Sequence, residues 1–362
     1  MSHYDRDLYI QSRRISLDTP TYFIADLASN HDGDLQRAKA LIWKAKECGA
    51  DAVKFQHFLA YAIVSDRGFT QLERMSHQKA WKGSIYEIYE KCELDRTWTR
   101  TLQETARDAG IHFMTSPYDF DAIEQTVGAV DAFKIGSGEI TWSDALTRIA
   151  AAGKPTILAT GASTMVEVER AVDAVLAVNP RFSLMQCNTN YTGSPDNFRF
   201  INLRVLNTFA ARWPGLVLGI SDHTPGHSVV LGAVTLGARI VEKHFTDDNQ
   251  RIGPDHGFSM TPLTWRDMVD RTREVELALG DGVKRLETNE AEAAVVQRRC
   301  LRLARNLLAG SIIGPCDVEP LRPAPPGSVE PHALRGVLGR RLRVTKERGD
   351  DLKWTDLEDG RD

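Results

Sequence analysis

The sequence has 362 residues, of which 42% are hydrophobic and 26% charged, the balance of an ordinary soluble globular protein. Its net charge of −4 is spread along the chain, which argues against a nucleic-acid-binding protein. Residues 1–18 lack the apolar core of a secretory signal, and no apolar run approaches the roughly 18 residues of a membrane span. Five cysteines without CxxC spacing predict free thiols, and the expected compartment is the cytoplasm.

Short apolar segments alternate with longer helical ones from residue 20 to about residue 280. Most of the apolar segments are rich in Ile, Val, Phe and Leu and lack in–out alternation, which is typical of parallel strands buried on both faces. The predicted strands are residues 21–26, 52–56, 112–115, 132–135, 156–160, 183–187, 216–220 and 240–243.

Helical periodicity fills most of the intervals between these strands. The predicted helices are residues 34–49, 164–178, 197–213, 228–237 and 263–279. Eight strands, nearly all followed by a helix, predict an α/β fold of the (β/α)8 TIM-barrel type. Residues 59–94 are the exception, because they are long, aromatic and polar. We expect them to form an elaborated active-site loop and a helix.

The composition changes near residue 281, where the chain becomes charged and poor in large apolar residues. The pattern predicts a barrel domain at 1–282, a linker of helical character at 283–298 and a small β-rich domain at 299–362. Short apolar runs separated by Gly and Pro, including the RPAPPGS segment at 322–328, indicate this second domain.

Charged residues stand at the ends of two predicted barrel strands, where the active residues of such barrels lie. Lys54 lies in VKFQ beside Gln56, and Lys134 precedes the Gly-Ser-Gly turn that contains Ser137. A lysine inside an apolar strand is costly to bury unless it meets an anion. The two lysines and the open backbone of the turn therefore predict a site for a phosphate or carboxylate.

Polar residues at the remaining strand ends indicate a metal and a sugar. His223 and His244 end neighbouring strands, so their imidazoles could bind one divalent ion of the Mn, Fe or Zn type; the alternative is a pair of structural histidines. Thr189 and Tyr191 belong to an Asn-rich segment suited to a polyol or to a turn. The residues alone leave condensation, isomerisation and hydrolysis open.

The sequence resembles the N-acetylneuraminate (sialic acid) synthase family over about residues 20–360. The likeness rests on eight motifs in family order and on a tail similar to the family's antifreeze-like (SAF) domain. The motifs are SNHDGD, GADAVKFQ, TSPYDFDAIE, FKIGSGEI, GKPTILATG, ISDHTPGH, GARIVEKHFT and GPDHGFSM. The resemblance implies condensation of phosphoenolpyruvate with N-acetylmannosamine or a relative, release of phosphate, and a divalent metal, usually Mn²⁺.

The resemblance also implies roles for individual residues. His223 and His244 would bind the metal, and Asp26 stands at the position of the family's catalytic glutamate. The residues implied for phosphoenolpyruvate are Lys54, Ser116, Lys134, Ser137 and Ser221; those implied for the acceptor are Gln56, Tyr191, Glu242 and Asp255. In the domain-swapped homodimer of the family, Arg322 would reach the partner's site.

The sequence departs from the family pattern at Asp26, Ala159 and Thr192, and it has no clear match around residues 76–82 for an acceptor-binding asparagine. Because most of these changes concern the catalytic group or the acceptor side, we hypothesise a modified acceptor sugar. Two alternatives are a related 3-deoxy-ulosonate synthase that uses another aldose and a non-catalytic sugar-binding descendant.

Overall fold

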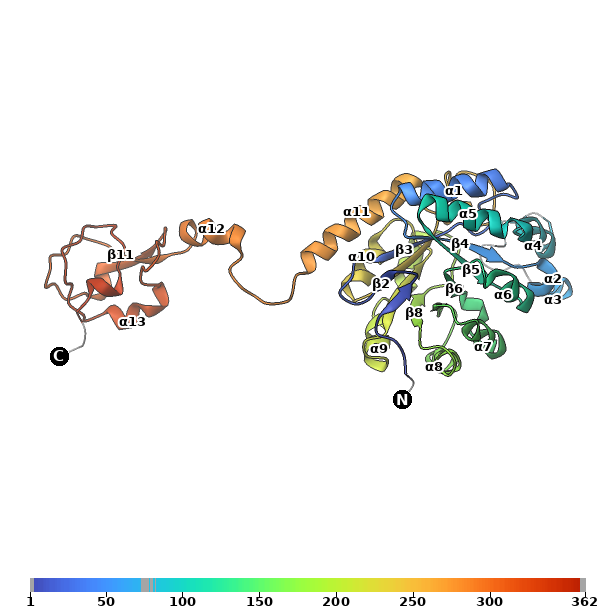
Figure 1. Ribbon diagram of the computed structural model, residues 1–362. Helices are drawn as coiled ribbons and strands as arrows, with labels where there is room; N and C mark the ends of the chain where they lie inside the picture. Colours follow the sequence, from blue (N-terminus) through green and yellow to red (C-terminus); the bar gives the residue numbers. More distant parts are fainter. Residues whose placement is uncertain (1–2, 73–77, 79–80, 82, 359–362) are drawn as a thin grey trace. The chain divides into compact units, whose positions relative to one another are not determined.

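The computed structural model describes residues 3–72, 78, 81 and 83–358, which form two units (Figure 1). Contacts divide the chain into a first unit that ends at Gly280 and a second that begins at Asp281. The described helices include none long and apolar enough to cross a membrane.

The first unit is a closed barrel of parallel strands in the order β10-β3-β4-β5-β6-β7-β8-β9. This confirms the predicted (β/α)8 fold. The strands are β3 (Tyr22–Asp26), β4 (Ala52–His57), β5 (His112–Pro117), β6 (Ala132–Ile135), β7 (Thr156–Ala159), β8 (Phe182–Cys187), β9 (Val217–Asp222) and β10 (Ile240–His244).

Successive residues of each strand face opposite sides of the barrel wall, and both sides are buried. Ile24, Met114 and Met185 belong to the apolar cluster inside the barrel. Phe23, Phe113 and Leu184, their neighbours along the chain, pack outward in the layer between strands and helices. Burial on both faces explains why the strands are apolar throughout.

Helices surround the barrel (Figure 1). They are α1 (Leu35–Glu47), α2 (Ala60–Ile63), α3 (Asp66–Gln71), α4 (Ile85–Cys92), α5 (Thr99–Ala109), α6 (Phe120–Thr126), α7 (Ser143–Ala151), α8 (Met165–Leu176), α9 (Val205–Arg212), α10 (Ser228–Thr235) and α11 (Pro262–Leu279). The segment at 59–94, predicted as one loop and a helix, contains α2, α3 and α4.

The helix predicted at residues 197–213 is shorter than expected. Pro195–Phe200 forms a 3-10 helix, and α9 begins only at Val205. Asn202, between them, has a φ of 48°, a left-handed conformation that a continuous helix cannot contain. Periodicity alone did not reveal this interruption.

The N-terminal hairpin of β1 (Leu8–Ile10) and β2 (Arg13–Ile15) was not predicted. Leu8, Ile10 and Ile15 are fully buried and join the cluster inside the barrel. The hairpin therefore contributes to the core of the first unit.

The second unit contains a small apolar core. Its elements are α12 (Ala291–Val296), β11 (Cys300–Leu303), β12 (Val318–Leu321) and α13 (Leu334–Val337). Antiparallel pairing of β11 with β12 and several isolated bridges confirm the β-rich character. Leu301, Leu303, Leu342 and Leu352 are buried together. The predicted linker at 283–298 contains a 3-10 turn, Thr288–Glu290, and α12.

Candidate active site

Charged side chains from four strands, β3, β4, β6 and β10, meet at the carboxyl end of the barrel. Lys54 Nζ lies 2.8 Å from Asp26 Oδ2 and 3.1 Å from Glu242 Oε2. Lys134 Nζ lies 3.0 Å from Glu242 Oε1. The parallel register sets Asp26 opposite Lys54, because it pairs β3 with β4 at these positions. The four side chains form one buried chain of alternating charge, which we call the lysine–carboxylate chain.

Burial and charge act in opposite directions on the lysine–carboxylate chain. Burial alone would lower the pKa of Lys54, but the carboxylates of Asp26 and Glu242 raise it above its ordinary value. For Lys134, burial prevails over its single carboxylate, and the pKa is lowered. Burial would raise the pKa of Glu242, whereas the two ammonium groups hold it below the usual range. Lys134 is therefore the lysine that loses its proton more easily.

Hydroxyl and amide groups surround these charges. Ser221 Oγ donates to Glu242 Oε1 at 3.0 Å, and Gln56 Nε2 donates to Asp26 Oδ2 at 3.2 Å. Ser116 Oγ is buried without a hydrogen-bond partner. A buried hydroxyl in this state is a ready donor to a substrate oxygen.

The loops that follow β6, β7 and β8 come close together at Ser137. Its Oγ accepts a hydrogen bond of 2.9 Å from the amide of Gly161. A Cβ at Gly161 would stand 1.8 Å from Thr189 Oγ1 and 2.9 Å from Ser137 Oγ. Only glycine therefore lets the backbone at residue 161 pack against both Ser137 and Thr189.

The two candidate metal ligands lie side by side. The ring centroids of His223 and His244 are 5.4 Å apart. The Nδ1 of His223 lies 3.2 Å from the carbonyl oxygen of Asn188, which fits an Nδ1–H donor and leaves Nε2 available. His244 Nε2 lies 3.4 Å from Asp26 Oδ2, while its buried Nδ1 has no hydrogen-bond partner.

These histidines fit a divalent metal with open coordination positions. Two neighbouring imidazoles with uncommitted nitrogens are a suitable donor set for Mn, Fe or Zn ions. Among the described residues, no group of three or more His, Cys, Asp or Glu side chains is arranged to hold a metal. Two histidines leave open coordination positions that water and substrate could occupy.

A cavity of about 260 Å³ opens beside His244 and is lined by three of the four predicted acceptor residues; Glu242 is not among its lining residues. Gln56, Thr189, Tyr191, His244 and Asp255 all line it. Asp255 is fixed by hydrogen bonds from the amide of Ser29, at 3.1 Å, and from its hydroxyl, at 2.5 Å. Gln56 and His244 also approach Asp26, so the cavity borders the lysine–carboxylate chain at that residue.

Aromatic residues that the sequence did not single out form part of this cavity's wall. The ring of Phe58 packs against Tyr89 and Tyr118 at centroid distances of 5.6 and 6.0 Å. Tyr118 directly follows the strand-end residues Thr115-Ser116-Pro117, so its position at a strand end was an available signal. Tyr89 belongs to the aromatic segment 59–94, which was expected to contribute an active-site loop, whereas Phe58 carried no such signal.

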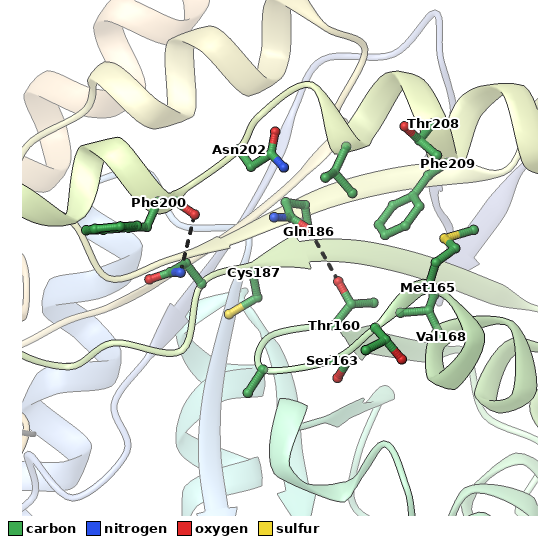
Figure 2. Close-up of a pocket in the computed structure, with 14 residues that line it drawn as sticks. Thr160, Ser163, Met165, Val168, Gln186, Cys187, Phe200, Asn202, Thr208 and Phe209 are labelled. Carbon is green, nitrogen blue, oxygen red and sulfur yellow. Dashed lines mark hydrogen bonds between the residues drawn. The ribbon is translucent and has the colours of Figure 1, made fainter. Parts of the chain in front are cut away.

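A second cavity of about 580 Å³ lies beside the mouth, between the loops that follow β7 and β8 (Figure 2). Figure 2 shows Thr160 directed at Gln186, whose amide donates to the Ile201 carbonyl. Cys187 lines this cavity, and its Sγ lies 3.9 Å from Thr189 Oγ1, which faces the first cavity. Most of the described polar side chains that line this second cavity already form hydrogen bonds within the protein.

The structure brings together all the predicted site residues of the first unit. Arg322 belongs to the second unit, where it follows β12 and is exposed. Its proposed action in a partner's site stays a prediction. Of residues 76–82, where the acceptor-binding asparagine lacks a match, only Gln78 and Trp81 are among the described residues.

Comparison with known proteins gives matches along most of the chain. Residues 41–284 match the model of the NeuB family, and residues 298–358 match that of the SAF domain. The chain is 35% identical over 343 residues to N,N'-diacetyllegionaminic acid synthase of Legionella pneumophila, covering 93% of the chain and 94% of the relative. It is 30% identical over 338 residues to human N-acetylneuraminate-9-phosphate synthase, covering 92% and 91%.

A solved structure is similar in fold to this chain. The N-acetylneuraminic acid (sialic acid) synthetase of Leptospira borgpetersenii, in complex with citrate, is similar with a TM-score of 0.69 at 26% identity. The match covers 81% of this chain and 96% of that one.

Proposed function

The chain belongs to the NeuB family and carries a SAF domain, and from this premise we propose that it is a nonulosonate synthase. In this proposal it condenses phosphoenolpyruvate with the open-chain aldehyde of an N-acyl hexosamine, N-acetylmannosamine or a modified relative, and releases phosphate. The observation that carries the proposal is the buried pair Lys54 and Lys134. The lysine–carboxylate chain to which they belong borders, at Asp26, a cavity lined by acceptor-type polar groups.

Phosphoenolpyruvate would bind to the two lysines and the adjacent hydroxyls. Its phosphate and carboxylate carry the negative charge that Lys54 and Lys134 attract, and Ser116, Ser137 and Ser221 offer hydroxyl donors. A substrate anion that replaces Glu242 beside Lys134 would keep the buried ammonium group paired with a negative charge. This arrangement orients carbon 3 of phosphoenolpyruvate toward the cavity that holds the acceptor.

The reaction forms one carbon–carbon bond and replaces the bond from carbon 2 to the phosphate oxygen with a bond to the oxygen of water. Carbon 3 of phosphoenolpyruvate attacks the aldehyde carbon, whose oxygen takes up a proton. Water adds at carbon 2, and phosphate leaves from the resulting tetrahedral centre as the new carbonyl group forms. Asp26 Oδ2 lies within reach of Lys54, Gln56 and His244 and would accept the proton that the adding water gives up. The lysines then stabilise the departing phosphate.

His223 and His244 would hold the divalent metal, which we propose to be Mn²⁺. When bound, the metal supplies Lewis-acid polarisation of the acceptor aldehyde. Gln56, Tyr191, Glu242 and Asp255 would orient the acceptor sugar around it. We further propose a cytoplasmic homodimer in which Arg322 of one chain completes the acceptor site of the other.

The direct test is a phosphate-release screen with phosphoenolpyruvate and a panel of acceptors, run with Mn²⁺ and with EDTA. The panel pairs N-acetylmannosamine with diacetamido hexoses and with phosphorylated aldoses. We expect metal-dependent release with at least one N-acyl hexosamine and none with His223→Ala. Release only with phosphorylated aldoses that lack an acylamino group would favour the alternative ulosonate synthase. No release with any acceptor would favour the non-catalytic descendant.

A further inference from the structure

A buried lysine of the barrel wall stands between the two histidines in the sequence and has no part in the proposed reaction. Lys243 lies in β10 directly before His244, and the parallel register sets it opposite Asp222 of β9. Because side chains alternate along a strand, Lys243 faces the helices, whereas Glu242 and His244 face the mouth. The exposed fractions of the Lys243 and Asp222 side chains are 1% and 0%.

The ammonium group of Lys243 draws the end of β9 and the following loop together. Its Nζ donates to Asp222 Oδ2 at 2.5 Å and to the carbonyl oxygen of Thr224 at 2.6 Å. The other carboxylate oxygen of Asp222 accepts from the amide of Thr224, at 3.0 Å, and from its hydroxyl, at 2.9 Å. Residues 222–224 therefore fold around one cation.

These bonds restrain the backbone of both histidines from the helix-facing side of the barrel wall. His223 is the residue between Asp222 and Thr224, so both of its peptide neighbours are bound to Lys243. His244 is joined to Lys243 by a peptide bond. The His223 ring is fixed again at its far side by the Asn188 carbonyl, 3.2 Å from Nδ1.

We propose that Lys243 is a positioning residue that sets the spacing of His223 and His244 for a shared divalent metal. The inference rests on the metal site of the proposed function and adds the residue that shapes it. Partners behind the ligating residues of a metal site commonly change its affinity 10–100-fold.

Packing alone does not account for a charge at this position. Two residues earlier along the same pair of strands, the register sets Val241 opposite Ile220, and both belong to the apolar layer. A buried ion pair is generally no more stabilising than a well-packed apolar pair of the same volume. What the ion pair at 243 and 222 adds is directional bonding to the backbone on both sides of His223.

The test is Mn²⁺ binding by the full-length chain, followed through the electron paramagnetic resonance signal of free Mn²⁺ at fixed pH. We expect Lys243→Met to raise the Mn²⁺ dissociation constant about 10–100-fold. Since this change leaves Asp222 without its cation, the double variant Lys243→Met/Asp222→Asn is measured in parallel. The asparagine oxygen can still accept from the Thr224 amide, so we expect the double variant to fold and to bind Mn²⁺ as weakly as the single variant.

Arg273→Met is the matched control. Arg273 pairs with Glu276 at 2.7 Å and donates to the Thr21 carbonyl at 2.9 Å, before the start of β3 and thus at the opposite end of the barrel. We expect it to lower the melting temperature without changing Mn²⁺ affinity.

The outcomes separate the inference from its premise. Wild-type affinity in the double variant would overturn the role of Lys243 and leave the metal site intact. A wild-type chain whose Mn²⁺ binding is absent, or unaffected by His223→Ala, would contradict the two-histidine site itself and remove the inference with it.

Discussion

Asp26 is one methylene shorter than the glutamate that occupies its position in the family pattern. Its carboxylate nevertheless reaches Lys54 at 2.8 Å and Gln56 at 3.2 Å, and a backbone amide donates to its other oxygen at 3.1 Å. Asp26 is 1% exposed, and both of its carboxylate oxygens already have partners. A longer acid would have to displace these partners.

We accordingly expect Asp26→Glu to lower the activity, although glutamate is the residue of the family pattern. The extra methylene displaces the carboxylate by more than 1 Å, and an error of that size costs on the order of 100-fold in rate. The measurement is kcat/KM for phosphoenolpyruvate at saturating acceptor. Asp18→Glu, at a side chain that is 70% exposed, serves as the control. Activity equal to or above wild type in Asp26→Glu would contradict this account.

Lys134 predicts a specific pH dependence. Because burial lowers its pKa below the ordinary 10.5, it loses its charge at a lower pH than an unperturbed lysine. We expect kcat/KM for phosphoenolpyruvate to decline as pH rises through that lowered pKa, since a neutral amine no longer attracts the anion. Lys54, whose pKa is raised, keeps its charge over the same range.

Lys134→Arg provides the check, because a guanidinium does not titrate in this range. Its activity at neutral pH should be reduced by the changed geometry, but the alkaline decline should move to higher pH or disappear. An alkaline decline identical to that of the wild type would assign the titration to another group.

At this scale, a charge that interrupts an apolar strand is a useful signal for the position of a side chain. Lys54 and Lys134 show this signal, and the structure places both beside Glu242, while their role in binding stays a prediction. Lys243 shows the same signal in VEKHF but was passed over. Because side chains alternate between the two faces of a strand, Lys243 must face the opposite side from Glu242 and His244. This alternation would have identified it as a buried charge that faces the helices.

At the scale of elements, the N-terminal hairpin is the feature that the sequence did not reveal. Its strands are three residues each, and the turn between Ile10 and Arg13 contains Gln11 and Ser12 instead of the Asn-Gly that favours such turns. Gln11 adopts a φ of 50°, which is unusual for a residue with a side chain. Tertiary packing, not local preference, thus holds this hairpin.

The hairpin should therefore contribute to stability through its inward residues only. We expect Ile10→Ala, at a fully buried side chain, to lower the free energy of unfolding by about 2–5 kcal/mol. Tyr9→Ala, at the neighbouring side chain that is 48% exposed, should change it by less than about 0.5 kcal/mol. Urea denaturation of both variants measures the difference. Equal effects would show that the hairpin does not pack as described.

The eight barrel strands were predicted within two residues at either end, because burial on both faces makes them apolar throughout. Helix ends were less accurate where a local conformation interrupts the pattern. Asn202, in its left-handed conformation, is the case in point: the periodic pattern runs through it while the helix does not.

At the scale of the whole molecule, the proposed domain-swapped dimer would bring Arg322 of one chain to the active site of the other. The test is complementation between two defective chains. His223→Ala and Arg322→Ala should each be poorly active alone. In mixed dimers the His223→Ala chain would supply its intact Arg322 to the site of the Arg322→Ala chain.

With random exchange, an equimolar mixture should regain about a quarter of wild-type activity, because half the dimers are mixed and each has one complete site. Chains refolded or coexpressed together are compared with chains mixed immediately before the assay. If Arg322 acts within its own chain, the mixture will stay as inactive as its components.

The lysine–carboxylate chain has a consequence for how substrate reaches the site. Lys54 and Lys134 are matched by Asp26 and Glu242, so that this group of buried side chains is electrically neutral before any ligand arrives. Binding of phosphoenolpyruvate then resembles counter-ion exchange, in which one internal anion gives way to another. An entrance of this kind exerts little long-range attraction, and its association rate should depend only weakly on ionic strength. Selection among anions would rest on shape and local bonding at the lysines, not on the strength of a distant field.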